Sequence, residues 1–305
     1  MAVVFDVLLF GEALVDEFPS VRALGGAPFN VACHLRALGA SPLFVTRVGR
    51  DADGRRLVDA MKRRGVDTRG VQRDPGHRTA RAVIRAEPAG PAFVIPDRQA
   101  FDFIDGAAAL DAVRGVTPRL VYFGTLAQRH DVSREALDAL LDEVSGTRFL
   151  DVNLRSPWFD RDVLERSLGR SAFVKMNEGE AAEIAGLFGL PAHGRSFRGA
   201  LSSRFGLTGL VVTSGEDGAI YRGQDGVESR VTPLRSGRRV VDTVGAGDAF
   251  AAVQILGRLR RWDTGASLAR ADAFARAICG LRGALPRRSS FYARFLREWG
   301  REIAA

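Results

Sequence analysis

The sequence has few of the residues that build covalent or metal-held frameworks. Among 305 residues there are two cysteines and four histidines, and the histidines show no metal-ligand spacing. We therefore expect Cys33 and Cys279 to be free, packed thiols in a reducing compartment, and the protein to be cytoplasmic. No apolar run has the length of a membrane span. The N-terminal segment lacks a basic start and carries Asp6 within its apolar stretch, which predicts a first strand rather than a signal peptide.

Lysine is also scarce, although the chain is basic. The formal net charge is +8, yet Lys62 and Lys175 are the only lysines, which leaves 42 arginines among the 44 basic residues. Short clusters such as "GRLRRW" (257–262), "SGRRV" (236–240) and "PRRSS" (286–290) are not interleaved with stacking aromatic residues. Composition bias accounts for this charge better than a nucleic-acid surface does, so no nucleic-acid partner and no membrane partner are expected.

Apolar runs of strand length alternate with amphipathic helical patterns. Near-continuous apolar strands separated by such helices indicate a parallel sheet covered by helices. The sequence predicts strands at 3–10, 42–49, 119–124, 148–153, 172–177 and 209–215, a strand-like segment at 238–243, and helices at 27–40, 51–65, 133–144, 161–168 and 178–189. After residue 247 the pattern is mostly helical to the end. No clear linker divides the chain, so we expect a single α/β domain over residues 1–305.

Residues 78–97 depart from this alternation. The segment "RTARAVIRAEPAGPAFVIPD" predicts two strands joined by a Pro/Gly turn, with no helix between them. A hairpin that projects from a parallel sheet is typical of a lid, and the alternative is an edge hairpin without a role. We expect a small β lid formed mainly by residues 78–97, with a short contribution from residues 17–25.

Polar residues follow the apolar strands at their carboxyl ends, where open parallel sheets bind ligands. The candidates are Asp16 after the first strand, Asp151, Asn153 and Arg155 in "DVNLR", Asn177, Glu178 and Glu180 in "NEGE", and Thr213, Ser214 and Gly215 in "TSGEDG". With the stretch at 242–248, five segments converge on one edge of the sheet. A constellation of this size predicts a ligand site there.

The stretch "DTVGAGDAF" (242–250) places two glycines at the start of an apolar helix. Gly245 and Gly247 permit backbone conformations closed to other residues, and unpaired amides at a helix N-terminus favour an anion. Asp248 alone could be a helix cap, but a cap explains neither the glycines nor the polar strand ends. The arrangement suits phosphoryl transfer, with the turn compensating charge and Asp248 accepting the proton of an attacking hydroxyl. Neither a Walker A motif nor a GxGxxG motif after the first strand is present.

Stretches along nearly the whole chain resemble the ribokinase-like (PfkB) carbohydrate kinases. "DTVGAGDAF" is similar to the second signature of that family, and "LGGAPFNVACHLRALG" (24–39) resembles the first. "RVGRDADG" (47–54), "DVNLR", "NEGE" and "TSGEDGA" occur in the family's order, and "FARAICGLRGALP" (274–286) resembles its adenine-side helix. "GGAPFNVA" with "DVNLR" followed by Trp158 is most similar to the fructokinase branch. The resemblance implies a three-layer α/β/α ribokinase-like core with a parallel central sheet and a small β lid.

The resemblance also implies an activity and a set of site residues. The activity is ATP-dependent transfer of a phosphoryl group to a sugar hydroxyl, most similar to that of a fructokinase, with ATP and Mg²⁺ as cofactors and K⁺ as an additional candidate. The implied roles are Asp248 as base; Gly245, Ala246 and Gly247 as anion hole; Asp16, Gly26, Asn30 and Arg155 at the substrate; Asn177, Thr213, Gly215, Gly218 and Gly247 at the nucleotide; Glu180 at Mg²⁺ through water; and Asp242 and Thr243 at a monovalent cation. Phe101 could stack on the sugar ring, or be an ordinary buried aromatic residue.

Three alternatives stay open at this point. A 2-keto-3-deoxy sugar acid would need an extra cation, which "HRTAR" (77–81) could supply, and a nucleoside would need an aromatic pocket that the sequence does not advertise. A non-catalytic sugar-binding regulator is disfavoured because Asp248 and the glycine turn are intact. Only eight residues separate Asp16 from Gly25, fewer than is usual in fructokinase-like relatives. The lid should therefore be small, and the protein a monomer or a homodimer.

Overall fold

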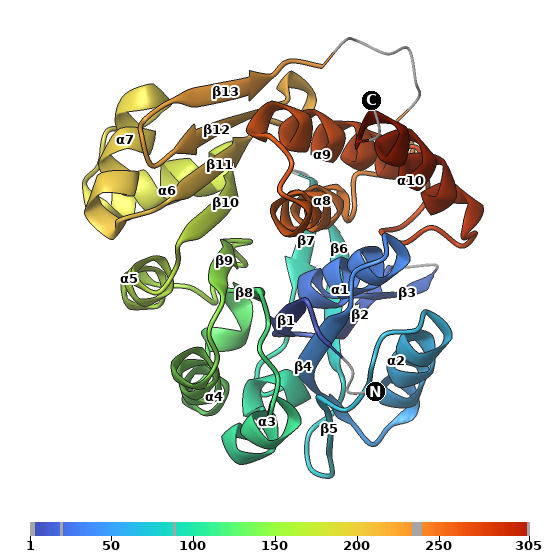
Figure 1. Cartoon of the computed structure of the whole chain (residues 1–305). Coiled ribbons are helices and arrows are strands. Elements are labelled where there is room, and N and C mark those ends of the chain that lie inside the picture. The colour runs from blue at the N-terminus through green and yellow to red at the C-terminus, as the bar shows by residue number, and fades with distance from the viewer. Residues whose placement is uncertain (1–3, 19–20, 88–89, 234–239, 304–305) are drawn as a thin grey trace.

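A central sheet runs through the molecule, and helices cover both of its faces (Figure 1). This computed structural model describes residues 4–18, 21–87, 90–233 and 240–303. One helical layer contains α1 (Ala27–Ala37), α2 (Ala52–Arg63), α8 (Ala246–Arg260), α9 (Thr264–Cys279) and α10 (Ser290–Ile303). The other contains α3 (Gly106–Ala112), α4 (Asp131–Glu143), α5 (Arg161–Gly169), α6 (Glu178–Phe188) and α7 (Gly194–Phe205). The expected three-layer α/β/α arrangement is confirmed.

The strands of this sheet are parallel except at one edge. In spatial order they are β13 (Glu228–Val231), β12 (Ala219–Gly223), β11 (Gly209–Thr213), β10 (Phe173–Asn177), β9 (Thr147–Asp151), β8 (Leu120–Gly124), β1 (Val7–Phe10), β4 (Pro42–Gly49) and β5 (Val71–Asp74). β12 and β13 are the antiparallel pair. From β1 the chain first builds β4 and β5 on one side and later β8 to β11 on the other. The winding therefore reverses between β1 and β8, the kind of position where open sheets bind ligands.

A second, four-stranded sheet is built from two separate segments of the chain. Its order is β3 (Arg22–Gly25), β2 (Leu14–Glu17), β6 (Ala80–Glu87) and β7 (Gly90–Val94). β6 and β7 form the hairpin expected within residues 78–97, and its turn at 88–89 lies outside the described residues. Residues 14–25 contribute two strands, more than the short contribution expected from 17–25, of which 19–20 are not described.

Asp16 does not follow the first strand as the sequence suggested. It lies within β2 of the second sheet, opposite Ala23 on β3 and Ala82 on β6. The reason is Gly11, whose φ of +145° turns the chain after β1 so that a new strand can begin three residues later. Asp16 therefore reaches the site from the second sheet rather than from the rim of the first.

Two other strand boundaries differ from expectation. β1 begins at Val7 rather than at residue 3, and residues 1–3 are outside the described part. Within 238–243, residues 240–243 are not a strand, and 238–239 are not described. The amides of Val241 and Asp242 donate instead to the carbonyl of Cys279 at the end of α9, at 2.8 and 3.2 Å. These bonds use the donors that a sheet partner would need.

The described helices give no sign of a membrane span, because none of them is both long and apolar enough to cross a bilayer. Cys33 and Cys279 are free thiols, as expected.

Candidate active site

The N-terminus of α8 provides free backbone donors. Gly245 precedes the helix in the left-handed region, with φ +79°, and a Cβ there would lie 2.3 Å from the Cβ of Ala284. Glycine is therefore required by both conformation and space. The Ala246 amide donates to the Thr243 carbonyl at 3.2 Å, whereas those of Gly245, Gly247 and Asp248 have no hydrogen-bond partner among the described residues. The amide of Ala246, which was expected in the anion hole, is thus already used, and the other three are available to an anion.

Asp248, in the first turn of α8, is held by a residue from the other end of the chain. The Nδ2 of Asn30 on α1 donates to Asp248 Oδ2 at 2.8 Å. Asn30 is buried, and its Oδ1 has no partner within the described residues. A buried acceptor without a donor is uncommon, and a ligand hydroxyl beside Asp248 would satisfy it. Gly26, the N-cap of α1 with φ +104°, keeps the backbone close, since a Cβ there would lie 2.6 Å from the carbonyl oxygen of Glu12.

Two further carboxylates face this pair. Burial raises the pKa of Asp16 to about 6, Asp248 and Asp242 add to the increase, and Arg155 opposes it. Burial also raises the pKa of Glu12 to about 7, against the lowering effect of its backbone hydrogen bonds and Arg155. Glu12 Oε1 accepts the Ala27 amide at 3.2 Å. Arg155 is thus a cation whose charge acts on both Glu12 and Asp16.

The floor of the site is a buried ion pair. Lys175 Nζ donates to both carboxylate oxygens of Asp151, at 2.9 and 3.1 Å, and the Tyr122 hydroxyl donates to the same carboxylate at 3.2 Å. A Cβ on Gly247 would lie 3.1 Å from Lys175 Nζ, so the ammonium lies directly below the glycine turn. Burial opposes its charge, but Asp151, Glu180 and Asp248 outweigh burial and raise the pKa of Lys175 above its ordinary value. The lysine is therefore charged beneath the free amides.

The position of these side chains follows from strand alternation. Phe149 on β9 and Phe173 on β10 face the α8 layer and stack at 4.7 Å. Asp151 and Lys175 lie two residues further along the same strands and on the same face. Along β9 and β10, the side chains on this face thus change from aromatic to charged where the strands reach the start of α8.

Asn177 and Glu180 form a reciprocal cap at the start of α6. Asn177 Oδ1 accepts the Glu180 amide at 2.9 Å, and Glu180 Oε2 accepts the Asn177 amide at 2.8 Å. Glu180 Oε1 accepts the amide of Leu154 at 2.9 Å, in the loop after β9. Both oxygens thus hold backbone in place, which leaves a water-mediated contact as the fitting mode for a metal ion.

The remaining residues expected at the nucleotide lie near β11. Thr213 ends β11, and its hydroxyl is 3.4 Å from the Met176 carbonyl. Gly215 has φ +55° with nothing within 4 Å of a Cβ, so that side of the backbone is open. At Gly218, a Cβ would collide with the Val231 carbonyl. Gly218 therefore has a structural reason for being glycine.

Asp242 ties the glycine turn to the loop between α9 and α10. Its Oδ1 accepts the Val244 amide at 3.0 Å and its Oδ2 accepts the Gly283 amide at 2.9 Å. Thr243 is exposed, and its carbonyl accepts the Ala246 amide. The carboxylate of Asp242 thus already has two donors from the protein.

Phe101 does not face the site. Its side chain is fully buried in the core below the sheet, and the Arg129 guanidinium lies 4.8 Å from the ring centroid. A ring with no exposed surface cannot stack on a sugar in this arrangement, so the alternative of a buried aromatic residue applies.

Sequence reasoning missed Glu12 and Lys175. Each carried a signal: Glu12 is an acid directly after an apolar strand, and Lys175 is one of two lysines, placed inside the otherwise apolar "AFVKMN" (172–177). Charged residues in such positions are rarely buried without a partner.

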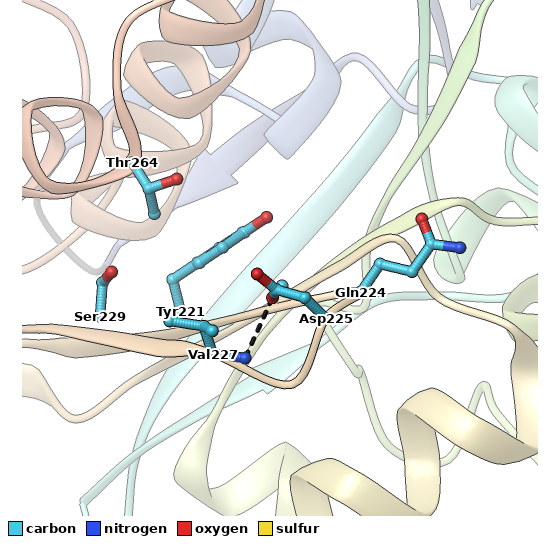
Figure 2. A pocket seen from close by; sticks show the side chains of 7 residues that line it. Tyr221, Gln224, Asp225, Val227, Ser229 and Thr264 are labelled. Carbon is cyan, nitrogen blue, oxygen red and sulfur yellow. Dashed lines mark hydrogen bonds between the residues drawn. The ribbon is translucent and has the colours of Figure 1, made fainter.

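A cavity of about 530 Å³ lies elsewhere, against the β12–β13 hairpin (Figure 2). Tyr221, Asp225 and Thr264 line it, and the Asp225 carboxylate accepts the Val227 amide at 3.0 Å. Because Gly223 pairs with Gly209 at the amino end of β11, this cavity is at the opposite edge of the sheet from the site.

Comparisons with known proteins agree with this geometry. Residues 6–288 match the model of the pfkB family of carbohydrate kinases. Fructokinase-2 of Oryza sativa subsp. japonica is 32% identical over 268 residues, covering 80% of this chain and 77% of that protein. Fructokinase of Klebsiella pneumoniae is 30% identical over 267 residues, covering 82% and 83%.

Solved structures share the fold. Fructokinase from Vibrio cholerae O395, bound to fructose, ADP and calcium ion, superposes with a TM-score of 0.78 at 25% identity over 96% of this chain and 99% of that one. Fructokinase from Xylella fastidiosa with bound ATP gives 0.83 at 22% identity over 97% and 100%. The chain belongs to the pfkB family of carbohydrate kinases, and it is a sugar kinase.

Proposed function

We propose that the protein is an ATP-dependent fructokinase in which Asp248 is the catalytic base. The observation that carries the proposal is the Asn30–Asp248 contact, with an unpaired buried acceptor on Asn30 and free amides directly beside Asp248. A sugar hydroxyl that donates to Asn30 Oδ1 would lie next to the Asp248 carboxylate. Relatives named fructokinase at 30–32% identity support fructose as the acceptor.

The proposed mechanism divides the work among these groups. Asp248 accepts the proton of the attacking hydroxyl, and Asn30 fixes the orientation of the carboxylate through its Nδ2. The free amides of Gly245 and Gly247 compensate the charge that develops on the migrating phosphoryl group. Lys175 adds a fixed positive charge below the turn, held in place by Asp151.

The charges around the acceptor favour a neutral sugar over a sugar acid. Glu12, Asp16 and Asp248 surround the position of the hydroxyl, and Arg155 is the cation that faces them. Arg81, one of the cations within residues 77–81, lies 3.7 Å from Glu17, which offsets part of its charge. These three acidic groups would repel a substrate carboxylate, whereas ionised Asp16 can accept two hydroxyl donors of a neutral polyol.

The proposed cofactors are ATP, Mg²⁺ and a monovalent cation. ATP is the proposed donor, with Asn177, Thr213, Gly215 and Gly218 around the nucleotide. Mg²⁺ supplies charge neutralisation on the phosphates when bound, and Glu180 would orient its water shell because both of its oxygens already hold amides. Asp242 and Thr243 remain the proposed surroundings of a monovalent cation, with carbonyl oxygens as the main ligands.

The second sheet is proposed as the lid, since it carries Asp16 while α8 carries Asp248. A bound sugar would bridge the two parts of the molecule and exclude water from the reacting groups.

A screen for ATP consumption across ketoses, aldoses, sugar acids and nucleosides tests this proposal. Fructose should give the highest kcat/KM, and Asp248→Asn should lower kcat by about 10²–10⁴ while nucleotide affinity is retained. A higher kcat/KM for a sugar acid would reject the neutral-substrate argument, and retained turnover in the Asp248→Asn variant would reject the base.

A further inference from the structure

The loop between α9 and α10 carries a second concave surface that the proposed reaction does not use. A cavity of about 610 Å³ is bounded by this loop and by the first turns of α10, which lies beside α9 in Figure 1. Leu281, Leu285 and Phe291 are half-buried and form an apolar floor. Pro286, Arg287, Arg288 and Ser290 of "PRRSS" (286–290), a cluster without an assigned role, also line it.

Four exposed arginines surround this floor. They are Arg282, Arg287, Arg288 and Arg294. Within the described part of the chain, none of them is in an ion pair with a carboxylate. Arg294 lies over the rings of Phe291 and Phe295, at 4.9 and 4.5 Å from the centroids, which keeps its charge near the cavity.

Some other exposed arginines of this basic chain are paired with carboxylates. Arg114 is paired with Asp111 at 3.0 Å, and Arg166 with Asp138 at 2.9 Å. Four positive charges around one cavity repel one another, and no carboxylate among the described residues forms an ion pair with them. An anion bound between them would remove that repulsion, and guanidinium groups match phosphate oxygens in geometry.

We propose that this cavity, which we call the arginine pocket, binds an organic phosphate with an apolar or aromatic body. The arginines provide the charge for the phosphate, and Leu281, Leu285 and Phe291 provide a surface for the body. The volume is that of a small-molecule site, which favours a metabolite over a nucleic-acid strand.

The arginine pocket is separate from the proposed substrate site but shares a loop with it. Ala284 abuts Gly245, and the Gly283 amide bonds Asp242, whereas the flanking Leu281, Arg282 and Leu285 line the pocket. The Pro286 carbonyl accepts a hydrogen bond from the guanidinium of Arg64, directly after α2, at 3.3 Å. The loop is thus fixed on one side by the glycine turn and open to ligand on the other.

Calorimetric titration of the full chain tests the proposal, with a non-hydrolysable ATP analogue present to occupy the nucleotide site. The probes are phenyl phosphate and inorganic phosphate. Phenyl phosphate should bind with one equivalent, and more tightly than inorganic phosphate because its ring covers the apolar floor. Removing two arginines, in R287A/R288A, should weaken it at least ten-fold, with melting temperature and basal turnover unchanged.

The double variant R114A/R195A is the matched control, because it removes two exposed arginines elsewhere and should bind phenyl phosphate as the parent does. Three results of the phenyl phosphate titrations would overturn the proposal. They are no saturable binding, equal loss of binding in both double variants, and binding that appears only without the ATP analogue, which would place the arginines in the nucleotide site. Binding of a 20-nucleotide single-stranded DNA without binding of phenyl phosphate would also overturn it.

Discussion

The buried Lys175–Asp151 pair allows a stability role to be separated from a catalytic one. Lys175→Met removes a buried partner and leaves the Asp151 carboxylate with the Tyr122 hydroxyl as its remaining donor. Breaking a buried ion pair in this way costs about 3–5 kcal/mol of unfolding free energy. The double variant Lys175→Met/Asp151→Asn removes both charges and should recover most of that loss.

Activity should not recover with stability. Lys175 Nζ lies below Gly247, where a Cβ would be 3.1 Å from it. If a phosphoryl group held by the turn comes within about 4 Å of Nζ, the two unit charges interact by about 4 kcal/mol at an effective dielectric constant near 20. The expected loss in kcat is therefore about 10²–10³, in both the single and the double variant. Urea unfolding measures the stability, and coupled ADP release measures kcat.

The matched control is Lys62→Met, which removes the exposed lysine on α2 and should change neither quantity. If the double variant is stable and turns over within ten-fold of the parent, Lys175 is a structural residue and its charge does not contribute to catalysis.

Three further perturbations follow from single contacts. Burial raises the pKa of Glu12 from 4.5 in the unfolded chain to about 7, so between these pH values the folded state keeps a proton that the unfolded state releases. The free energy of unfolding should therefore fall by up to about 1.4 kcal/mol per pH unit as the pH rises through this range. Glu12→Gln should flatten this slope in urea titrations, and an unchanged slope would contradict the assignment. Gly245→Ala should destabilise more than Gly115→Ala, since both have positive φ but a Cβ on Gly115 meets nothing within 4 Å, and equal melting temperatures would show that the Ala284 contact is unimportant. Glu180→Gln, which loses an acceptor for one backbone amide, should cost about 1–3 kcal/mol and raise the Mg²⁺ concentration needed for half-maximal rate; an unaltered Mg²⁺ profile would exclude Glu180 from the metal network.

Long apolar runs made most of the main sheet predictable. β4 has the predicted bounds of 42–49, and β10 begins one residue inside the predicted strand, because these strands are mostly buried and mostly apolar. The glycine turn before α8 was also recognisable, since its positive φ at Gly245 restricts the residue type. Patterns that depend on local geometry are visible in a sequence.

Features that depend on tertiary partners were harder to predict from the sequence. β2 and β3 have four residues each; β3 pairs with β2, and β2 pairs with β6, so the stability of both depends on a distant segment that these short stretches do not reveal. Residues 240–243 are apolar enough for a strand, but their amides pair with the end of α9. The role of Lys175 depends on Gly247, 72 positions later, whose proximity no local pattern reports.

The contact between Asn30 and Asp248 joins residues 218 positions apart, and it has a consequence for biosynthesis. During translation every parallel strand of the main sheet leaves the ribosome before α8 does. The nascent chain can therefore form most of its scaffold while its reactive centre is still missing. Until α8 docks, the nascent chain also exposes the apolar surface of α1 and β1 that belongs to the same core as α8. Newly made chains should therefore be most prone to associate with one another in the interval before the last helices dock.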